Sequence, residues 1–335
     1  MHLTLLVPGL LWPREILHDT TFDLKLPALS LLLGRGRRRP LEGEEAWLAK
    51  TFGVPAPLPV APLRLLGDGG NPGHDEWLCL DPVHLRLEER TIVVDDPARL
   101  ALTADEDAAL RAAVAPLFAS LADLVVRSPG QWYLRLKQHP ALETQALPRV
   151  IGQSADPLTP AGDDGAAWRR LLAEAQPLLH QHAINRAREV AGRPTINSLW
   201  PWGLGRLPPM TSHAFDRIWN GDALLKGLGA LAGVLVEPVP DQFTRIEGRV
   251  LVRLDHLMPS LGTFNATAWR HGLSEIDANW LAPALAAVRT GRCRGLTLIA
   301  SGHDRAFAVD IGRRDLWRFW HKPRTLAEVA TWSET

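Results

Sequence analysis

Cysteine is scarce in this chain, which has two cysteines among its 335 residues. They are Cys79 and Cys293, which lie far apart and outside any CxxC spacing. Because disulfide scaffolds and zinc knuckles depend on closely spaced cysteines, this usage argues against both kinds of site. We therefore predict two buried thiols in a reducing compartment.

The chain also lacks net charge and long hydrophobic runs. Its 37 basic and 37 acidic residues balance, so the composition suggests neither nucleic acid nor an anionic membrane as a partner. No stretch reaches the roughly 18 apolar residues that span a bilayer. The opening MHLTLLVPGLLWP has no basic n-region and is interrupted by Pro8 and Gly9, so it predicts a β-strand and not a signal peptide. We expect a cytoplasmic protein.

Two features depart locally from this balance. The stretch GRGRRRP, residues 34–40, carries four arginines within five residues. Phosphate binding is one interpretation, and a solvated loop after a helix is the favoured one. The chain also has 13 tryptophans, and the pairs Trp200/Trp202 and Trp317/Trp320 are expected to anchor packing before they stack on ligands.

The N-terminal quarter predicts a strand, a helix and a loop in that order. Leu3–Val7 is a short apolar run of the kind found in buried parallel strands. Residues 26–33 have leucines at helical spacing, with Pro27 in the first turn and glycines after the last. Residues 55–73 are rich in proline and glycine, which predicts a loop.

Residues 77–165 have a different texture. WLCLDPVHLRLEERTIVVDD and QWYLRLK alternate as strands do. Between them, Thr103 with Glu106 three residues later forms a capping box, which predicts a helix. We therefore predict a small α+β subdomain over 77–165, inserted into a core of 1–76 and 166–335.

Strands and helices alternate after the insertion. Trp168 to His182 is a strongly amphipathic helix, and residues 266–288 are predicted to be mostly helical. Residues 233–239, 250–254 and 296–300 are strand-like, while RAFAVDIG and LWRFWHK are expected to close the sheet. This alternation predicts an α/β fold with a mostly parallel sheet between helices.

Glycines gather between Asn185 and Phe243, in NRAREVAGRPTINSLWPWGLGRLPP and GDALLKGLGALAGVLVEPVPDQF. The pairs Gly203/Gly205 and Gly227/Gly229 predict turns or close backbone approaches. The order of these pieces resembles archaeal-type, cofactor-independent phosphoglycerate mutases, which belong to the alkaline-phosphatase superfamily. LPALSLLLGRG, DPVHLR with VVDDPARLALTADED, and ANWLAPAL are similar to family segments in the same order. The resemblance implies an alkaline-phosphatase-like core with an inserted domain.

The resemblance also implies chemistry for which the expected residues are missing. The family holds two divalent metals with Asp and His, and a Ser or Thr attacks the phosphoryl group. The first strand should end in Asp-Gly and ends here in Pro8-Gly9, while the nucleophile segment GNPGHDEW has neither Ser nor Thr. Further ligand positions fall near Met258, Pro259 and Thr263. The candidates that remain for metal binding (Mn, Zn or Mg) are His74, Asp75, Asp255, His256 and His303.

A degenerate subgroup, the RpfE-type regulatory proteins, is similar in more detail. It shares the LLVPGLLWP opening, the LLHxHxxNxxRE helix end and the INSLWxWGxG turn. This resemblance implies a regulatory association and no particular biochemical activity.

Several side chains are candidates for binding a small ligand. His84 and Arg86 are two residues apart, so they are expected to share one face of a strand. That face could hold a phosphate or carboxylate, with Arg86 as the bidentate donor. The alternative is that both side chains have structural roles. A helix that ends in His180 and His182 is followed by Asn185, Arg186 and Arg188. These residues either bind a ligand or have a structural role, in which the cations complement the helix C-terminus. The selected ligand-binding candidates are Asp81, His84, Arg86, Asn197, Gly203, Gly205, Arg206 and Lys226.

Two functional hypotheses follow. The first is a regulatory protein that has lost phosphoryl transfer, needs no cofactor, and binds a small phosphorylated metabolite or a protein partner. The second is an active metal-dependent mutase or phosphatase with relocated ligands. The missing nucleophile and first-strand aspartate favour the first, because phosphoryl transfer depends on metal electrostatics.

Overall fold

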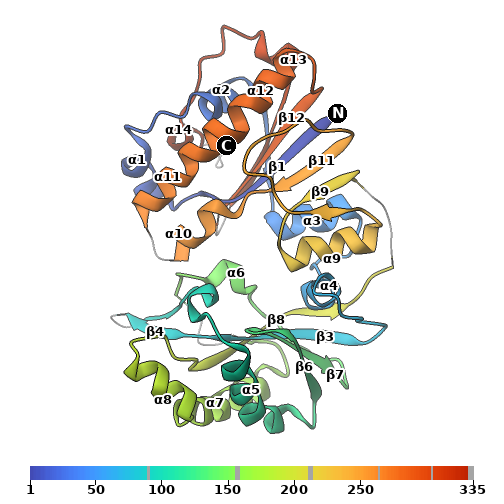
Figure 1. The fold of residues 1–335 in the computed structure, drawn as a ribbon, viewed down its shortest axis with the longest axis vertical. Helices are drawn as coiled ribbons and strands as arrows, with labels where there is room; N and C mark the ends of the chain where they lie inside the picture. The colour runs from blue at the N-terminus through green and yellow to red at the C-terminus, as the bar shows by residue number, and fades with distance from the viewer. Residues whose placement is uncertain (89–90, 155–158, 210–213, 263–264, 303–304, 331–335) are drawn as a thin grey trace. The chain divides into compact units, whose positions relative to one another are not determined.

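The computed structural model describes residues 1–335 apart from 89–90, 155–158, 210–213, 263–264, 303–304 and 331–335 (Figure 1). The chain forms two compact units. Unit 1 comprises Met1–Pro57, Met210–Leu225 and Gly229–Thr335, and unit 2 comprises Leu58–Pro209 and Lys226–Leu228. Unit 2 is larger than the predicted 77–165 insertion, because α4 (Val60–Gly67) and β8 (Ser198–Arg206) both pack with its strand β3 (Glu76–Val83).

Within the described residues, unit 1 is built on a seven-stranded sheet in the order β10-β9-β11-β1-β12-β13-β2. The pairs from β10 to β12 are parallel, and β13 and β2 add antiparallel strands at one edge. The predicted α/β class with a mostly parallel sheet is therefore confirmed. The strands are β1 (His2–Leu11), β2 (Arg37–Leu41), β9 (Arg217–Trp219), β10 (Val236–Glu237), β11 (Arg249–Arg253), β12 (Gly295–Gly302) and β13 (Ala306–Gly312).

The central strands of unit 1 are apolar because both of their faces are buried. β1 is buried from Leu3 to Leu11, and the core around it draws on α2, α11 and α12, which Figure 1 shows along one side of the sheet. The helices and turns of unit 1 are α1 (Arg14–Thr21), α2 (Pro27–Arg35), α3 (Glu44–Phe52), α9 (Ala223–Ala232, apart from Lys226–Leu228 of unit 2), η2 (Asp255–Leu257), α10 (Met258–Gly262), α11 (Ala266–Ile276), η3 (Asp277–Leu281), α12 (Ala282–Arg289), α13 (Arg313–Leu316) and α14 (Leu326–Ala330).

Unit 2 contains an antiparallel sheet in the order β6-β7-β3-β8. One sheet face packs on α5 and α7 through a core that includes Leu80, Trp132 and Trp168. The other elements are β4 (Leu85–Glu88) paired with β5 (Thr91–Val94), β6 (Ala122–Ser128), β7 (Gln131–Leu136), η1 (Pro97–Leu100), α5 (Ala104–Phe118), α6 (Leu147–Val150), α7 (Gly165–His180) and α8 (Ala183–Val190). The predicted capping box at Thr103 starts α5. Across the described part of both units, no helix is long and apolar enough to cross a membrane.

Some sequence-based assignments are wrong. The arginine-rich stretch at residues 34–40, for which a solvated loop was favoured, contains most of the strand β2. Residues 55–73 contain the helix α4. Its Pro62 lies in the first turn, where a proline does not interrupt a helix. Most of its residues are buried, so the sequence has no clear amphipathic pattern there. LWRFWHK does not close the sheet; it lies in the end of α13 and the turns after it, and β13 pairs with β2 instead.

Candidate functional site

The carboxyl ends of β11, β1 and β12 meet at one edge of the unit 1 sheet, where open α/β sheets place their ligands. β1 passes this edge at Pro8 and Gly9 and continues to Leu11, so the expectation that the first strand ends at Pro8-Gly9 is wrong. Gly9 has a φ of 78°, and its carbonyl oxygen accepts a 2.8 Å hydrogen bond from the indole N–H of Trp269. Three of the strands after which the resemblance places metal ligands therefore lie side by side, but β1 supplies no carboxylate.

Arg253, the last residue of β11, places its guanidinium group among carboxylates at this edge. Its Nη1 atom lies 2.8 Å from Oδ2 of Asp222 and 3.1 Å from Oδ1 of Asp255. Its Nε atom lies 3.2 Å from Oε1 of Glu44, and only 12% of the side chain is exposed. These four residues, here called the Arg253 cluster, place one cation among three carboxylates.

Each carboxylate of the Arg253 cluster is also held by a second contact. The Ser301 hydroxyl, at the end of β12, donates to Oε2 of Glu44 at 3.1 Å. The Asn220 amide donates to Oδ2 of Asp255 at 3.2 Å, and Asp222 caps the first turn of α9. The cluster is therefore built into the ends of several elements and is not a chance surface pairing.

The charges of the Arg253 cluster are coupled. Burial raises the pKa of Glu44 against the opposing attraction of Arg253, and burial raises the pKa of Asp255 in the same way. Desolvation lowers the pKa of Arg253, but the neighbouring carboxylates outweigh it and the net shift is upward. The guanidinium therefore opposes the upward pKa shifts that burial gives Glu44 and Asp255.

This arrangement does not fit a pair of divalent metal ions. A guanidinium and a metal compete for the same carboxylate oxygens, and Arg253 contacts all three carboxylates. His256 is exposed beside the cluster, and Met258 and Pro259 have side chains that do not bind hard cations. Among the residues that the structure describes, no three His, Cys, Asp or Glu side chains group as metal ligands would.

The other predicted metal ligands lie elsewhere. His74 and Asp75 are exposed residues of unit 2 that precede β3, and the Asp75 carboxylate lies 3.9 Å from Arg135. His303 and the predicted ligand position Thr263 both lie outside the described residues.

Asp81 is buried on the face of the unit 2 sheet that α4 covers. Its Oδ2 atom accepts 2.8 Å hydrogen bonds from Nη1 of Arg64 and from the indole N–H of Trp202. The Arg64 guanidinium also lies 5.2 Å from the Trp202 ring centre and 5.6 Å from that of Tyr133. With 3% of Asp81 exposed, this contact favours a role in fixing α4 on the sheet over ligand binding.

The side chains of His84 and Asn197 form hydrogen bonds at the junction between β3 and β4. Nδ1 of His84 lies 2.8 Å from the carbonyl oxygen of Thr195. The Asn197 side chain accepts from the N–H of Leu85 at 2.7 Å and donates to its carbonyl oxygen at 2.8 Å. Both side chains therefore have local structural partners.

Arg86 lies at a surface pocket of about 560 Å³ in unit 2. Its Nε atom is 3.1 Å from Oδ1 of Asp95, and Nη1 pairs with Glu88, so its charge is already balanced. Arg86 and Asn197 are predicted ligand-binding residues that do share a cavity, whereas Asp81 is not among the lining residues. The pocket is lined by Leu85, Arg86, Leu87, Ile92, Gln176, Pro177, His180 and Asn197.

The predicted glycine pair in β8 allows α4 to approach the strand closely. Gly203 has a φ of 71°, and a Cβ there would lie 2.9 Å from Cβ of Val60; at Gly205 it would lie 2.6 Å from Cβ of Pro59. Arg206 and Lys226 are exposed, and Arg206 lies 3.8 Å from Glu76. The glycines lie inside β8, so the predicted turn is wrong, and they allow close packing of α4 on the strand.

Replacing Gly203 by alanine is expected to lower the free energy of unfolding by about 2–4 kcal/mol, because left-handed backbone strain adds to overpacking against Val60. Gly192→Ala is the matched control, since Gly192 has a φ of 66° but open space around it. Its loss should be about 1–2 kcal/mol. Urea unfolding of both variants measures the difference, and equal losses would contradict the packing function.

The motif LLHQHAINRARE forms the end of α7 and the helix α8, where Asn185 and Arg188 are buried. The Asn185 amide donates to the carbonyl oxygens of Leu179 and Ile196 at 2.8 and 2.6 Å, and its Oδ1 accepts from the N–H of Ile196 at 2.8 Å. Asn185 therefore ties α8 to the segment that leads into β8.

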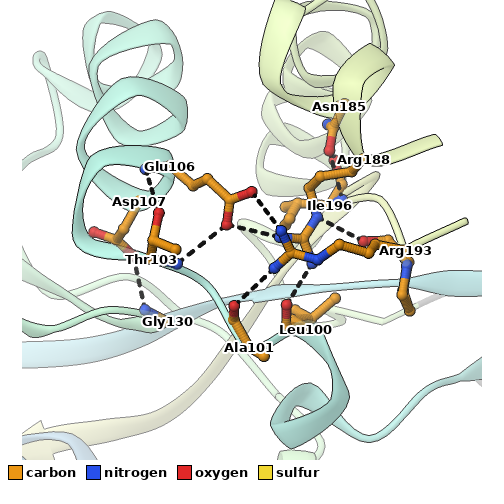
Figure 2. A network of polar contacts seen from close by, with 11 residues as sticks. Leu100, Ala101, Thr103, Glu106, Asp107, Gly130, Asn185, Arg188, Arg193 and Ile196 are labelled. Carbon is orange, nitrogen blue, oxygen red and sulfur yellow. Dashed lines mark hydrogen bonds and ion pairs between the residues drawn. The ribbon is translucent and has the colours of Figure 1, made fainter. Parts of the chain in front are cut away.

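Figure 2 shows Arg188 directed at Glu106, with its Nη1 2.8 Å from Oε2, while Nη1 of Arg193 lies 3.1 Å from the other oxygen. Arg188 also donates to the carbonyl oxygens of Leu100 and Pro194. Burial raises the pKa of Glu106, but hydrogen bonds from the Thr103 N–H and Arg188 outweigh it, so the pKa is lowered overall. Arg188 is thus an internal counterion.

Comparison with known proteins relates part of this chain to phosphoglycerate mutases. No protein-family model matches the chain. The 2,3-bisphosphoglycerate-independent phosphoglycerate mutase of Methanothrix thermoacetophila is 31% identical over 121 residues, which is 34% of this chain and 30% of that protein. The enzyme of the same name from Methanosarcina mazei is 30% identical over 128 residues, or 34% and 32% of the two chains. These matches span about a third of the curated relatives' length.

Solved structures match over more of the chain. The PH0037 protein from Pyrococcus horikoshii has a TM-score of 0.50 and 14% identity, covering 93% of this chain and 87% of that one. The cofactor-independent phosphoglycerate mutase from Thermoplasma acidophilum has a TM-score of 0.49 and 18% identity, covering 98% and 94%. The chain therefore shares the α/β fold of the PH0037 protein, and over about a third of its length it is similar in sequence to archaeal-type cofactor-independent phosphoglycerate mutases.

Proposed function

We propose that this chain is a phosphoglycerate-mutase-like regulatory protein, of RpfE type, that has lost metal-dependent phosphoryl transfer and acts in the cytoplasm by binding a ligand or partner. The observation that carries the proposal is the Arg253 cluster. A fixed guanidinium there contacts three carboxylates at the sheet edge where the related enzymes are expected to hold metals.

The chemistry supports this proposal. A divalent metal stabilises both the attacking and leaving oxygens, and it offers open coordination sites to substrate. A guanidinium donates hydrogen bonds but has no open coordination site, and the Nε and Nη1 atoms of Arg253 already lie against Glu44, Asp222 and Asp255. The absent carboxylate at Pro8 removes a further ligand. Under this proposal, the Arg253 cluster stabilises the sheet edge but does not support metal-dependent phosphoryl transfer.

The pocket beside Arg86 in unit 2 is the candidate ligand site under this proposal. Its lining is mainly apolar and carries the polar side chains of Gln176, His180 and Asn197. Such a mixture suits a small organic metabolite with a polar or phosphorylated end. Screening metabolites for binding to the intact protein tests this assignment.

The test is metal content combined with enzyme assay. Untagged protein grown and dialysed with Mn, Zn and Mg is analysed by elemental mass spectrometry and assayed for mutase and phosphatase activity. We expect less than one bound metal per chain and no activity in either assay. About two metals per chain, lost in Asp255→Asn, would support the active two-metal enzyme instead. Lys50→Gln, at an exposed position on α3, serves as the control for nonspecific effects.

A further inference from the structure

Three large aromatic side chains project from one short segment of unit 1. Trp317, Phe319 and Trp320 are 68%, 78% and 65% exposed. They follow α13 in successive turns, in which the N–H of Phe319 donates to the carbonyl oxygen of Trp317 at 2.8 Å. The expectation that Trp317 and Trp320 anchor packing is therefore wrong.

This cluster differs from the other exposed apolar residues. Phe22, Leu87, Val190 and Leu235 are also highly exposed, but they are far apart in the sequence. Isolated exposed apolar residues are normal on a protein surface, whereas a contiguous group marks an interaction site. The three large aromatic side chains within four residues therefore indicate an interaction site.

Basic residues surround these aromatic side chains. Residues 34–40 and 313–324 together contain nine arginines and lysines and one acidic residue, Asp315, in a chain with no net charge. Residues 34–40 and 313–324 are here called the basic-aromatic face.

The two segments of the basic-aromatic face are packed together. A Cβ on Gly34 would lie 2.2 Å from the carbonyl oxygen of Lys322, and Nη1 of Arg35 donates to the carbonyl oxygen of Leu316 at 2.5 Å. Figure 1 shows α2 and α13 at the same end of unit 1. The charges of both segments therefore act on the same surface.

Acidic neighbours neutralise only part of this charge. Asp315 lies 3.9 Å from Arg37 and 3.2 Å from Arg318, and Asp310 lies 3.4 Å from Arg39. Arg313, Arg314 and Lys322 are exposed beside the aromatic side chains. The face therefore keeps a net positive charge around an apolar centre.

We propose that the basic-aromatic face binds the surface of an anionic phospholipid membrane. Tryptophan and phenylalanine insert at the headgroup level, while arginine and lysine attract anionic lipids. Phe319 and Trp320 meet edge to face, with ring centres 5.1 Å apart and planes at 80°, so they form a small apolar knob. That geometry suits a bilayer interface better than stacked bases, which need open parallel ring faces.

The experiment is cosedimentation of the full chain with vesicles of phosphatidylcholine, with and without phosphatidylglycerol. Wild-type protein should bind the anionic vesicles, and less so as salt is raised. The triple variant Trp317→Ala, Phe319→Ala, Trp320→Ala should lose about tenfold or more in partitioning. Phe22→Ala combined with Leu235→Ala is the matched control and should bind as wild type does, since both side chains are exposed but isolated.

Charge is tested separately. Arg313→Gln, Arg314→Gln and Lys322→Gln should each weaken partitioning by about fivefold, whereas Lys25→Gln and Lys50→Gln should not. A melting curve like that of wild type verifies folding, because the substituted side chains are exposed. Absence of vesicle binding, equal binding to neutral vesicles, or preference for a single-stranded oligonucleotide would overturn the proposal. So would a wild-type dimer that the aromatic variant converts to monomer in sedimentation velocity.

Discussion

Arg253→Met is expected to lower the free energy of unfolding at neutral pH by about 3 kcal/mol, the lower end of the range for breaking buried ion pairs. The substitution keeps a long side chain but leaves Glu44, Asp222 and Asp255 without their shared counterion. The lower end applies because the side chains of Asp222 and Asp255 are 34% and 42% exposed, so water screens part of the repulsion.

The loss in Arg253→Met should shrink as the pH falls. Burial already raises the pKa of Glu44 above its ordinary value of 4.5, and removing Arg253 removes the charge that opposes this shift. A carboxyl group with a raised folded-state pKa favours folding below its unfolded pKa, and that contribution is lost as the pH rises through the folded value. The variant should therefore recover stability between the raised pKa and about pH 4.5.

The measurement is urea unfolding at several pH values, with hydrogen exchange to localise the loss to unit 1. Arg249→Met is the matched control on the same strand, because Arg249 is 50% exposed and its partner Asp216 is 47% exposed. An exposed pair of this kind contributes about 0–1 kcal/mol. Similar losses in the two variants, or a loss at Arg253 that grows on acidification, would show that the cluster is not held by its central cation.

The fold was predictable where burial gives a continuous apolar run or a simple period. β1 and β12 are apolar runs because both faces are covered, and α7 repeats Trp168, Leu172 and Ala175 on one face. α4 was missed because the prolines and glycines around it indicated a loop. The exposed Trp317 and Trp320 were misassigned because large aromatic residues are usually buried, and only tertiary packing decides the exception.

The site was only partly predictable. The resemblance implied that Pro8 stands where the related enzymes have an aspartate, and it selected Asp255, which lies in the Arg253 cluster. It gave no reason to select Arg253 or Glu44, which are separated by more than 200 residues in the sequence and meet only in the folded sheet. An arginine at the end of a predicted strand was the one available signal, and its partners were not readable without the topology.

The packing of unit 2 should depend on Arg188 to a similar degree. Arg188→Met is expected to lower the free energy of unfolding by about 3 kcal/mol, because Arg188 is 1% exposed and its loss removes the buried cation beside Glu106 and the donor to two carbonyl oxygens. Arg186→Met, on the exposed side of the same helix, should change stability by less than about 0.5 kcal/mol.

The pH dependence of the Arg188 loss should differ from that of the Arg253 loss. The pKa of Glu106 is lowered in the folded state, so its pairing stabilises the fold above its ordinary value of 4.5 and is lost as the pH falls through the folded value. The difference between wild type and Arg188→Met should therefore persist to about pH 4.5 and fade only below it. Hydrogen exchange should show lost protection in α5 and α8, because Glu106 and Arg188 lie on these two helices. A loss of ligand binding with unchanged stability would instead make Arg188 a binding residue, the alternative that its position beside a helix C-terminus had left open.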